Sequence, residues 1–144
     1  MPFVRRKILL AHKLLKLPLG RLSIALVGDT TMSRLHQEFM GIPGPTDVLS
    51  FELELDARGR CVEGELVICV SEARRQGRRR GITLPDEVLL YALHGLLHLG
   101  GWDDGTEAEY RAMHRKEDQL LQQLGVGRLF DRGRQATTTR GMKR

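Results

Sequence analysis

Hydrophobic residues recur along this chain with two periods, and each period predicts a type of element. A spacing of three to four residues indicates helices, whereas alternation or a short apolar run indicates strands. The predicted order is helix–strand–helix–strand–strand–helix–helix–helix, over residues 4–17, 22–27, 30–40, 48–55, 65–70, 71–80, 85–99 and 106–124. A short turn separates the two middle strands, so we expect an antiparallel hairpin, and the longer connections imply parallel pairing as well. The sequence therefore predicts a single α/β (α+β) domain with a small mixed sheet packed by about five helices.

Several residues at the ends of these segments favour the predicted helices. Asp29 or Thr30 is a candidate N-cap for the second helix, and Pro85 suits the first position of the long apolar helix. Thr106 and Glu109 have the spacing of a capping box at the start of the last helix.

The predicted domain covers residues 1–124. Residues 125–144 are rich in Arg, Gly and Thr with few large apolar side chains, so we expect a basic, flexible tail. No apolar run is long enough to cross a bilayer. The two cysteines, Cys61 and Cys69, do not suggest a disulfide framework, which favours the reducing cytoplasm.

The formal net charge of +5 is distributed unevenly. Residues 1–80 carry a balance of +5, residues 81–124 a balance of −5, and residues 125–144 again +5. Basic regions suit a polyanion such as RNA, and Arg74, Arg75 and Arg78 are candidate contacts to its backbone. The same arginines also complement the dipole of their own helix, so charge alone leaves both interpretations open.

Candidate chemistry is concentrated at the end of the long apolar helix. His94 and His98 are four residues apart, a spacing that places both imidazoles on one helix face. Gly100 and Gly101 break the helix, so the chain can turn back and bring Asp103 or Asp104 to the same ion. Two histidines and one carboxylate leave a zinc ion an open position for water, and His94 and Asp104 are then candidate catalytic residues.

The same segment could also be structural or belong to a peptidase. Histidines beside several leucines can be ordinary core residues, but burying imidazole and carboxylate without partners is costly, which favours a metal. Zinc peptidases of the HExxH type carry a glutamate directly after the first histidine. That position here is Gly95, which argues against peptide hydrolysis by that mechanism.

The segment HGLLHLGGWDD (residues 94–104) resembles the HGxLHLxGyDH motif of the bacterial YbeY-like family of rRNA maturation endoribonucleases. PTDVLSF (residues 45–51) matches the family's second block, GELVI (residues 64–68) is similar to its G-D-I-x-I strand, and Met113 and Glu117 match its M-x-x-x-E/Q. The resemblance covers about residues 20–124. It implies a single-domain α/β fold, zinc held by three side chains, and cleavage of single-stranded RNA linked to ribosome maturation.

The chain departs from the family pattern at two chemically important positions. The family's third ligand is a histidine, whereas Asp104 is a harder ligand that could favour manganese or magnesium; Asp103 and His114 remain alternative ligands. The family usually has an arginine thought to act on the phosphate where this chain has Met40, and Arg34, Arg58 or Arg60 could replace it.

The preferred interpretation is a metal-dependent, single-strand-specific endoribonuclease acting in rRNA maturation and ribosome quality control. His94, His98 and Asp104 are its predicted ligands, zinc its predicted ion, and RNA its partner. Ser50 joins the three arginines as a candidate substrate contact. Met40 and Asp104 also fit an RNA-associated protein with a structural metal and little turnover, and a hydrolase of peptides or small molecules is a third possibility.

Overall fold

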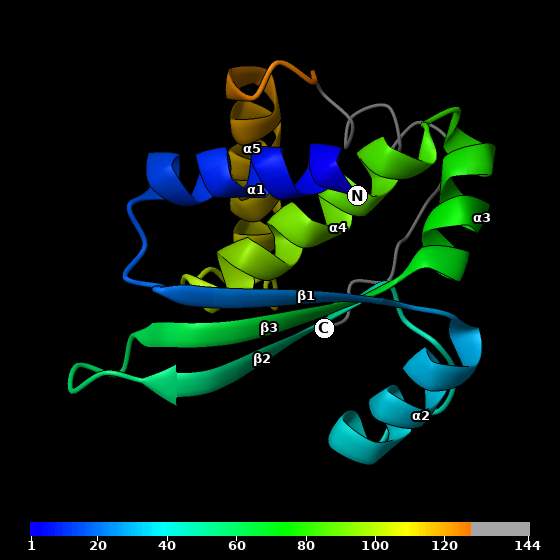
Figure 1. Ribbon diagram of the computed structural model, residues 1–144, viewed down its shortest axis with the longest axis horizontal. Coiled ribbons are helices and arrows are strands. Elements are labelled where there is room, and N and C mark those ends of the chain that lie inside the picture. Colours follow the sequence, from blue (N-terminus) through cyan, green and yellow to red (C-terminus); the bar gives the residue numbers. More distant parts are fainter. Residues whose placement is uncertain (128–144) are drawn as a thin grey trace.

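A three-stranded mixed sheet with helices on both faces forms the protein in the computed structural model, which describes residues 1–127 (Figure 1). The expected tail lies almost wholly outside the described residues. The elements are α1 (Pro2–Leu15), β1 (Arg21–Val27), α2 (Asp29–Met40), β2 (Val48–Leu55), β3 (Cys61–Cys69), α3 (Val70–Arg80), α4 (Leu84–Leu99) and α5 (Glu107–Gln123). Their number, type and order confirm the prediction made from hydrophobic periodicity.

The sheet has the order β1-β3-β2. β2 and β3 form the expected antiparallel hairpin, in which Ser50 lies opposite Leu66. β1 runs parallel to β3, with Ile24 opposite Leu66. The central strand begins at Cys61, four residues before the predicted start, because the hairpin pairing extends to the turn.

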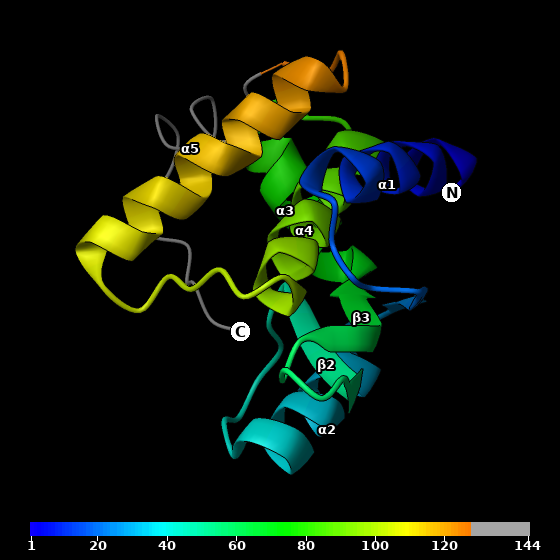
Figure 2. The ribbon, with the colours of Figure 1, turned by 90° about the vertical axis from the view of Figure 1, so that its left-hand side faces the viewer.

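The core lies mainly between the sheet and α4. This helix is apolar around most of its circumference and is buried along nearly its whole length, as expected for a central helix. α1 and α5 pack around it on the same side of the sheet, and α2 covers the opposite face (Figures 1 and 2). A smaller cluster around Met32 and Leu49 fills the space under α2.

The starts of the helices agree with most of the local sequence signals. Thr106 and Glu109 form the predicted capping box at α5, and the Thr83 side chain caps α4. The N-cap of α2 is Gly28, so the expectation of Asp29 or Thr30 was wrong by one or two residues. Asp29 lies in the first turn instead, where it pairs with Arg75 of α3.

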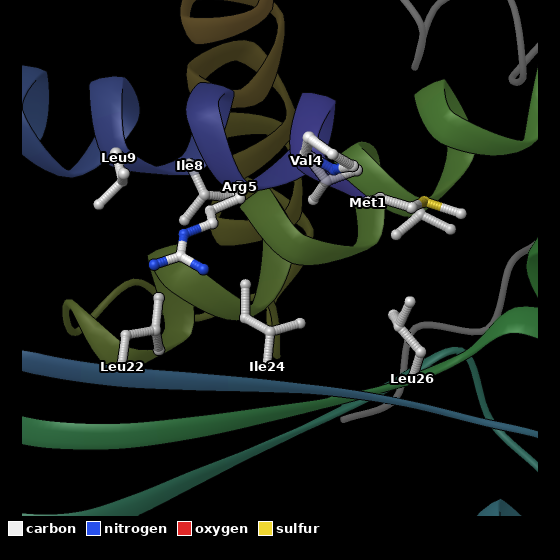
Figure 3. A pocket seen from close by; sticks show the side chains of 10 residues that line it. Met1, Val4, Arg5, Ile8, Leu9, Leu22, Ile24 and Leu26 are labelled. Carbon is white, nitrogen blue, oxygen red and sulfur yellow. The ribbon is translucent and has the colours of Figure 1, made fainter.

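An apolar groove with a volume of about 590 Å³ runs between α1 and β1 (Figure 3). Val4 and Ile8 line it from the helix, and Leu22 and Ile24 face them from the strand. Arg5 contributes the one charged side chain among its lining residues. The groove shares no residue with the histidine cluster on α4, so the candidate chemistry lies elsewhere. Among the described residues no helix is long and apolar enough to cross a membrane.

Candidate metal centre

The end of α4 positions the two histidines. Pro85 and the Thr83 cap fix where the helix begins, and the apolar residues of α4 hold it against the sheet. At its other end, the Gly101 N–H donates to the His98 carbonyl at 3.0 Å and the Trp102 N–H donates to the Leu97 carbonyl at 2.9 Å. Gly101 has a φ of 99°, a conformation that favours glycine. The chain turns back at this point, as predicted, and carries Asp104 toward the histidines.

Three side chains bring their ligand atoms together at this turn. His94 Nε2 lies 3.2 Å from His98 Nε2 and 3.4 Å from Asp104 Oδ2, and His98 Nε2 lies 3.7 Å from the same oxygen. Two ligands of a tetrahedral zinc, each about 2.1 Å from the ion, are about 3.4 Å apart. The three atoms therefore have the spacing of three corners of a zinc coordination tetrahedron, and the described part of the chain holds no other such group of ligands.

Asp103 and His114, the two remaining candidates for the third ligand, lie apart from this group. Asp103 is exposed and is not part of the converging group. His114, on α5, stacks on His94 with ring centroids 5.9 Å apart, but its Nδ1 lies 2.6 Å from Glu117 and it does not join the group. The geometry thus favours Asp104 among the three candidates.

Glu117 is the buried carboxylate behind the cluster. Its Oε2 lies 2.7 Å from His94 Nδ1, and its Oε1 lies 2.6 Å from His114 Nδ1. Burial disfavours the charged form of Glu117, but its hydrogen bonds to His114 and His94 outweigh burial and lower its pKa to about 2. Burial likewise disfavours protonated His94, but Asp104 and Glu117 outweigh it and raise the pKa of His94 to about 9. Asp104 and Glu117 thus stabilise positive charge at the position of His94.

Glu117 was identified from the sequence as a match to the family pattern, which did not predict this role. The available signal was the presence of His114 and Glu117 three residues apart on the apolar side of a predicted helix. Both side chains are buried there, and buried polar groups need partners. The second partner of Glu117, His94, is on another helix, and the sequence pattern alone did not show this contact.

Asp47, in the segment before β2, acts on the cluster through its charge. Its carboxylate adds to the raised pKa of His94, after the larger contributions of Asp104 and Glu117. This carboxylate accepts the Val48 N–H at 2.7 Å, while the Asp47 carbonyl accepts the Cys69 N–H at 2.9 Å. These two hydrogen bonds fix Asp47 at the entry to β2.

Ser50 and Gly95 explain the absence of a glutamate after the first histidine. The Ser50 hydroxyl lies 3.4 Å from the Gly95 carbonyl, where α4 crosses β2. A Cβ at Gly95 would lie 2.7 Å from Leu66 Cδ2 and 3.0 Å from Ser50 Oγ. A longer side chain at this position would point into the sheet and not toward His94 and His98.

The three arginines predicted to contact RNA do not lie near His94, His98 and Asp104. Arg74, Arg75 and Arg78 are exposed on α3, which lies at the other end of α4 from the Gly100–Gly101 turn (Figure 1). Arg75 pairs with Asp29 at 2.7 Å and with Glu72 at 2.7 Å. Met40 is exposed at the end of α2. A role for the arginines in RNA binding stays a prediction.

Comparison with known proteins identifies the family. The family model described as "Endoribonuclease YbeY" matches residues 4–125. The chain belongs to the YbeY family. Endoribonuclease YbeY of Thermobifida fusca is 44% identical over 111 residues, and the match covers 72% of this chain and 72% of the relative. Endoribonuclease YbeY of Gloeobacter violaceus is 40% identical over 116 residues, covering 76% of this chain and 59% of that longer relative.

The YbeY assignment confirms the resemblance inferred from the HGLLHLGGWDD and PTDVLSF segments. A solved structure gives independent support for the fold. The solution structure of TM1509 from Thermotoga maritima matches with a TM-score of 0.52 at 24% identity, covering 83% of this chain and 80% of that one. The YbeY relatives are named as enzymes that act on RNA, which does not favour the alternative of a structural metal without turnover.

Proposed function

We propose that this YbeY family member is a metal-dependent endoribonuclease that cleaves single-stranded RNA during rRNA maturation and ribosome quality control in the cytoplasm. Membership of a family whose relatives are named endoribonucleases supports the reaction class. The observation that carries the metal dependence is the convergence of His94, His98 and Asp104.

The three side chains fit a divalent cation. Their mutual distances suit zinc, and the carboxylate of Asp104 makes manganese or magnesium an alternative. When bound there, such a cation supplies Lewis acidity toward a phosphate oxygen and lowers the pKa of water.

The surrounding residues have defined tasks in this proposal. His94 and Asp104 meet at the reacting centre, and the charge of the Asp47 carboxylate adds to the raised pKa of His94. Ser50 is half-buried against the Gly95 carbonyl, and it stays a candidate contact for the substrate because it belongs to the PTDVLSF block that matches the family. The exposed Arg74 and Arg78 would hold RNA phosphates at a distance from the cleaved bond, and Arg75 would do so only by exchanging its carboxylate partners.

The test is cleavage of a labelled single-stranded RNA by the full chain, before and after metal removal by a chelator verified by mass spectrometry. We expect cleavage to be lost without metal and restored by zinc, manganese or magnesium, and to be weak on duplex RNA. His98→Ala should abolish it, whereas Glu107→Ala, at an exposed position of α5, should not. Undiminished cleavage by verified metal-free protein would overturn the mechanism.

A second pair of variants tests the structural-metal alternative. Met40→Arg and Asp104→His restore the side chains that the family usually has. If the natural protein binds metal and RNA without cleaving, while the double variant cleaves, the protein is an RNA-binding relative without turnover.

A further inference from the structure

One buried carboxylate joins two histidines directly behind the candidate ligands. Glu117 contacts His94 Nδ1 at 2.7 Å with one oxygen and His114 Nδ1 at 2.6 Å with the other. The exposed fractions of the Glu117 and His114 side chains are 1% and 7%. His94 belongs to α4 and the other two residues to α5, so the contacts also link the two helices.

The chemistry of a carboxylate fixes the direction of both hydrogen bonds. An ionised carboxylate only accepts, so both Nδ1 atoms must carry the protons. With its Nδ1–H committed to Glu117, His94 presents Nε2 to His98 and Asp104, and this is the nitrogen that lies 3.4 Å from Asp104. Glu117 thereby determines both the ring orientation of His94 and which nitrogen is available as a ligand.

His114 restrains Glu117 in turn. A carboxylate held only by His94 could rotate about its last bond, whereas the second bond from His114 fixes the plane of both oxygens. Tyr110 packs edge-on against the His114 ring with centroids 4.4 Å apart, and the His114 and His94 rings lie nearly parallel, at 17°. The His114 ring therefore has neighbours on more than one side.

We propose that His114 and Glu117 are positioning residues of the metal centre, which act on the ion only through His94. The inference rests on the metal site of the proposed function. It predicts that metal affinity depends on the hydrogen bond from position 114, although His114 is not a ligand. A merely structural buried pair would leave affinity unchanged as long as the protein folds.

Matched variants distinguish a positioning role from a merely structural one. The quantity measured is zinc affinity, by competition with a chromophoric chelator. Loss of an outer hydrogen bond to a metal-binding histidine typically weakens affinity about 10- to 100-fold. We expect this loss for Glu117→Ala and, toward the lower end of the range, for His114→Leu. His114→Asn should stay within about threefold of wild type, because asparagine Nδ2 occupies the place of histidine Nδ1 and still donates. Glu107→Ala is the control and should match wild type.

Wild-type affinity for both Glu117→Ala and His114→Leu would overturn the proposal. So would equal losses for His114→Leu and His114→Asn, because ring packing would then be the cause. If the leucine or alanine variant does not fold, nitrogen-15 NMR of the zinc-loaded wild type decides. Slowly exchanging Nδ1–H signals for both His94 and His114 support the proposal, and an Nε2–H on His94 contradicts it. Failure of the wild type to bind zinc would instead remove the proposed metal site itself.

Discussion

The Ser50 hydroxyl lies 3.4 Å from the Gly95 carbonyl, so β2 and α4 approach each other closely next to His94. A methyl group at position 95 would meet Leu66 at 2.7 Å, and Leu66 is fully buried. Overpacking of a core typically costs about 1–3 kcal/mol. Replacing glycine by alanine inside a helix stabilises the helix by about 1 kcal/mol. The cost of the clash with Leu66 should therefore outweigh the gain in helix propensity.

We therefore expect Gly95→Ala to lower the free energy of unfolding, measured by urea denaturation. The matched variant is Leu66→Val, which makes room for the added methyl. The double variant should lose less stability than the sum of the two single losses. A stabilising Gly95→Ala would show that helix propensity dominates and that the contact is relaxed.

The ion pair between Arg80 and Glu87 leads to a second prediction. Arg80 Nη2 lies 2.9 Å from Glu87 Oε2, and the two side chains are 1% and 0% exposed. Removing one partner of a buried pair leaves the other charge uncompensated, typically at a cost of about 3–5 kcal/mol. Arg80→Met should therefore destabilise strongly, whereas Arg80→Met with Glu87→Leu should recover most of the loss. Equal stability of the single and double variants in urea denaturation would contradict this.

Arg80 also marks what the sequence could not predict. Arg74, Arg75 and Arg80 belong to one basic cluster in the sequence, but they have different environments: Arg74 is exposed, Arg75 pairs with Asp29, and Arg80 is buried. Asp29 is 46 residues from Arg75, and such a partner depends on tertiary packing. By contrast, the four-residue spacing of His94 and His98 on a predicted helix was enough to predict that their imidazoles lie together.

In the candidate metal centre, too, local features could be predicted from the sequence, whereas contacts between helices could not. The apolar helix ends at Gly100 and Gly101 as predicted, Gly101 has a positive φ, and Asp104 follows within reach of the histidines. The bond between Glu117 and His94 joins residues 23 positions apart on two helices. The family pattern marked Glu117, but only the packing of α5 against α4 shows which imidazole it orients.

The exposed arginines of α3 give a prediction on RNA binding. Each contact to a single-stranded phosphate contributes about 0.7 to the slope of log affinity against log salt. If Arg74 and Arg78 both contact RNA, their joint replacement by alanine should weaken binding and reduce the slope by about 1.4. Arg111→Ala is the control, because Arg111 pairs with Glu107 on α5. An unchanged salt dependence would assign the α3 arginines to the stability of their own helix.

A pH prediction follows from Cys69. Burial raises the pKa of this thiol from 9.0 to about 11. Between these values the native state keeps a proton that the unfolded chain has lost, so the free energy of unfolding falls as pH rises through this window. Below pH 9 the thiol is protonated in both states and contributes no slope. Cys69→Ala should show a shallower decline between pH 9 and pH 11 in urea denaturation, and parallel declines would contradict the assignment.

The aspartate at the third ligand position leads to a prediction on metal selectivity. An imidazole at position 104 would be a softer, neutral ligand, which favours zinc, whereas the carboxylate of Asp104 favours harder ions such as manganese. Asp104→His should therefore raise the ratio of zinc to manganese affinity. Asp104→Asn is the matched control, because it removes the charge while keeping the size and one oxygen. It should weaken binding of both ions.

Competition titrations with each ion measure the ratio for the three proteins. If Asp104→His leaves the ratio unchanged while His98→Ala abolishes binding, the ion is held without Asp104, and the third ligand must be sought elsewhere. If the histidine variant binds zinc more tightly at the expense of manganese, Asp104 is a ligand. The departure from the family pattern at this position then changes the preferred ion and leaves the metal site in place.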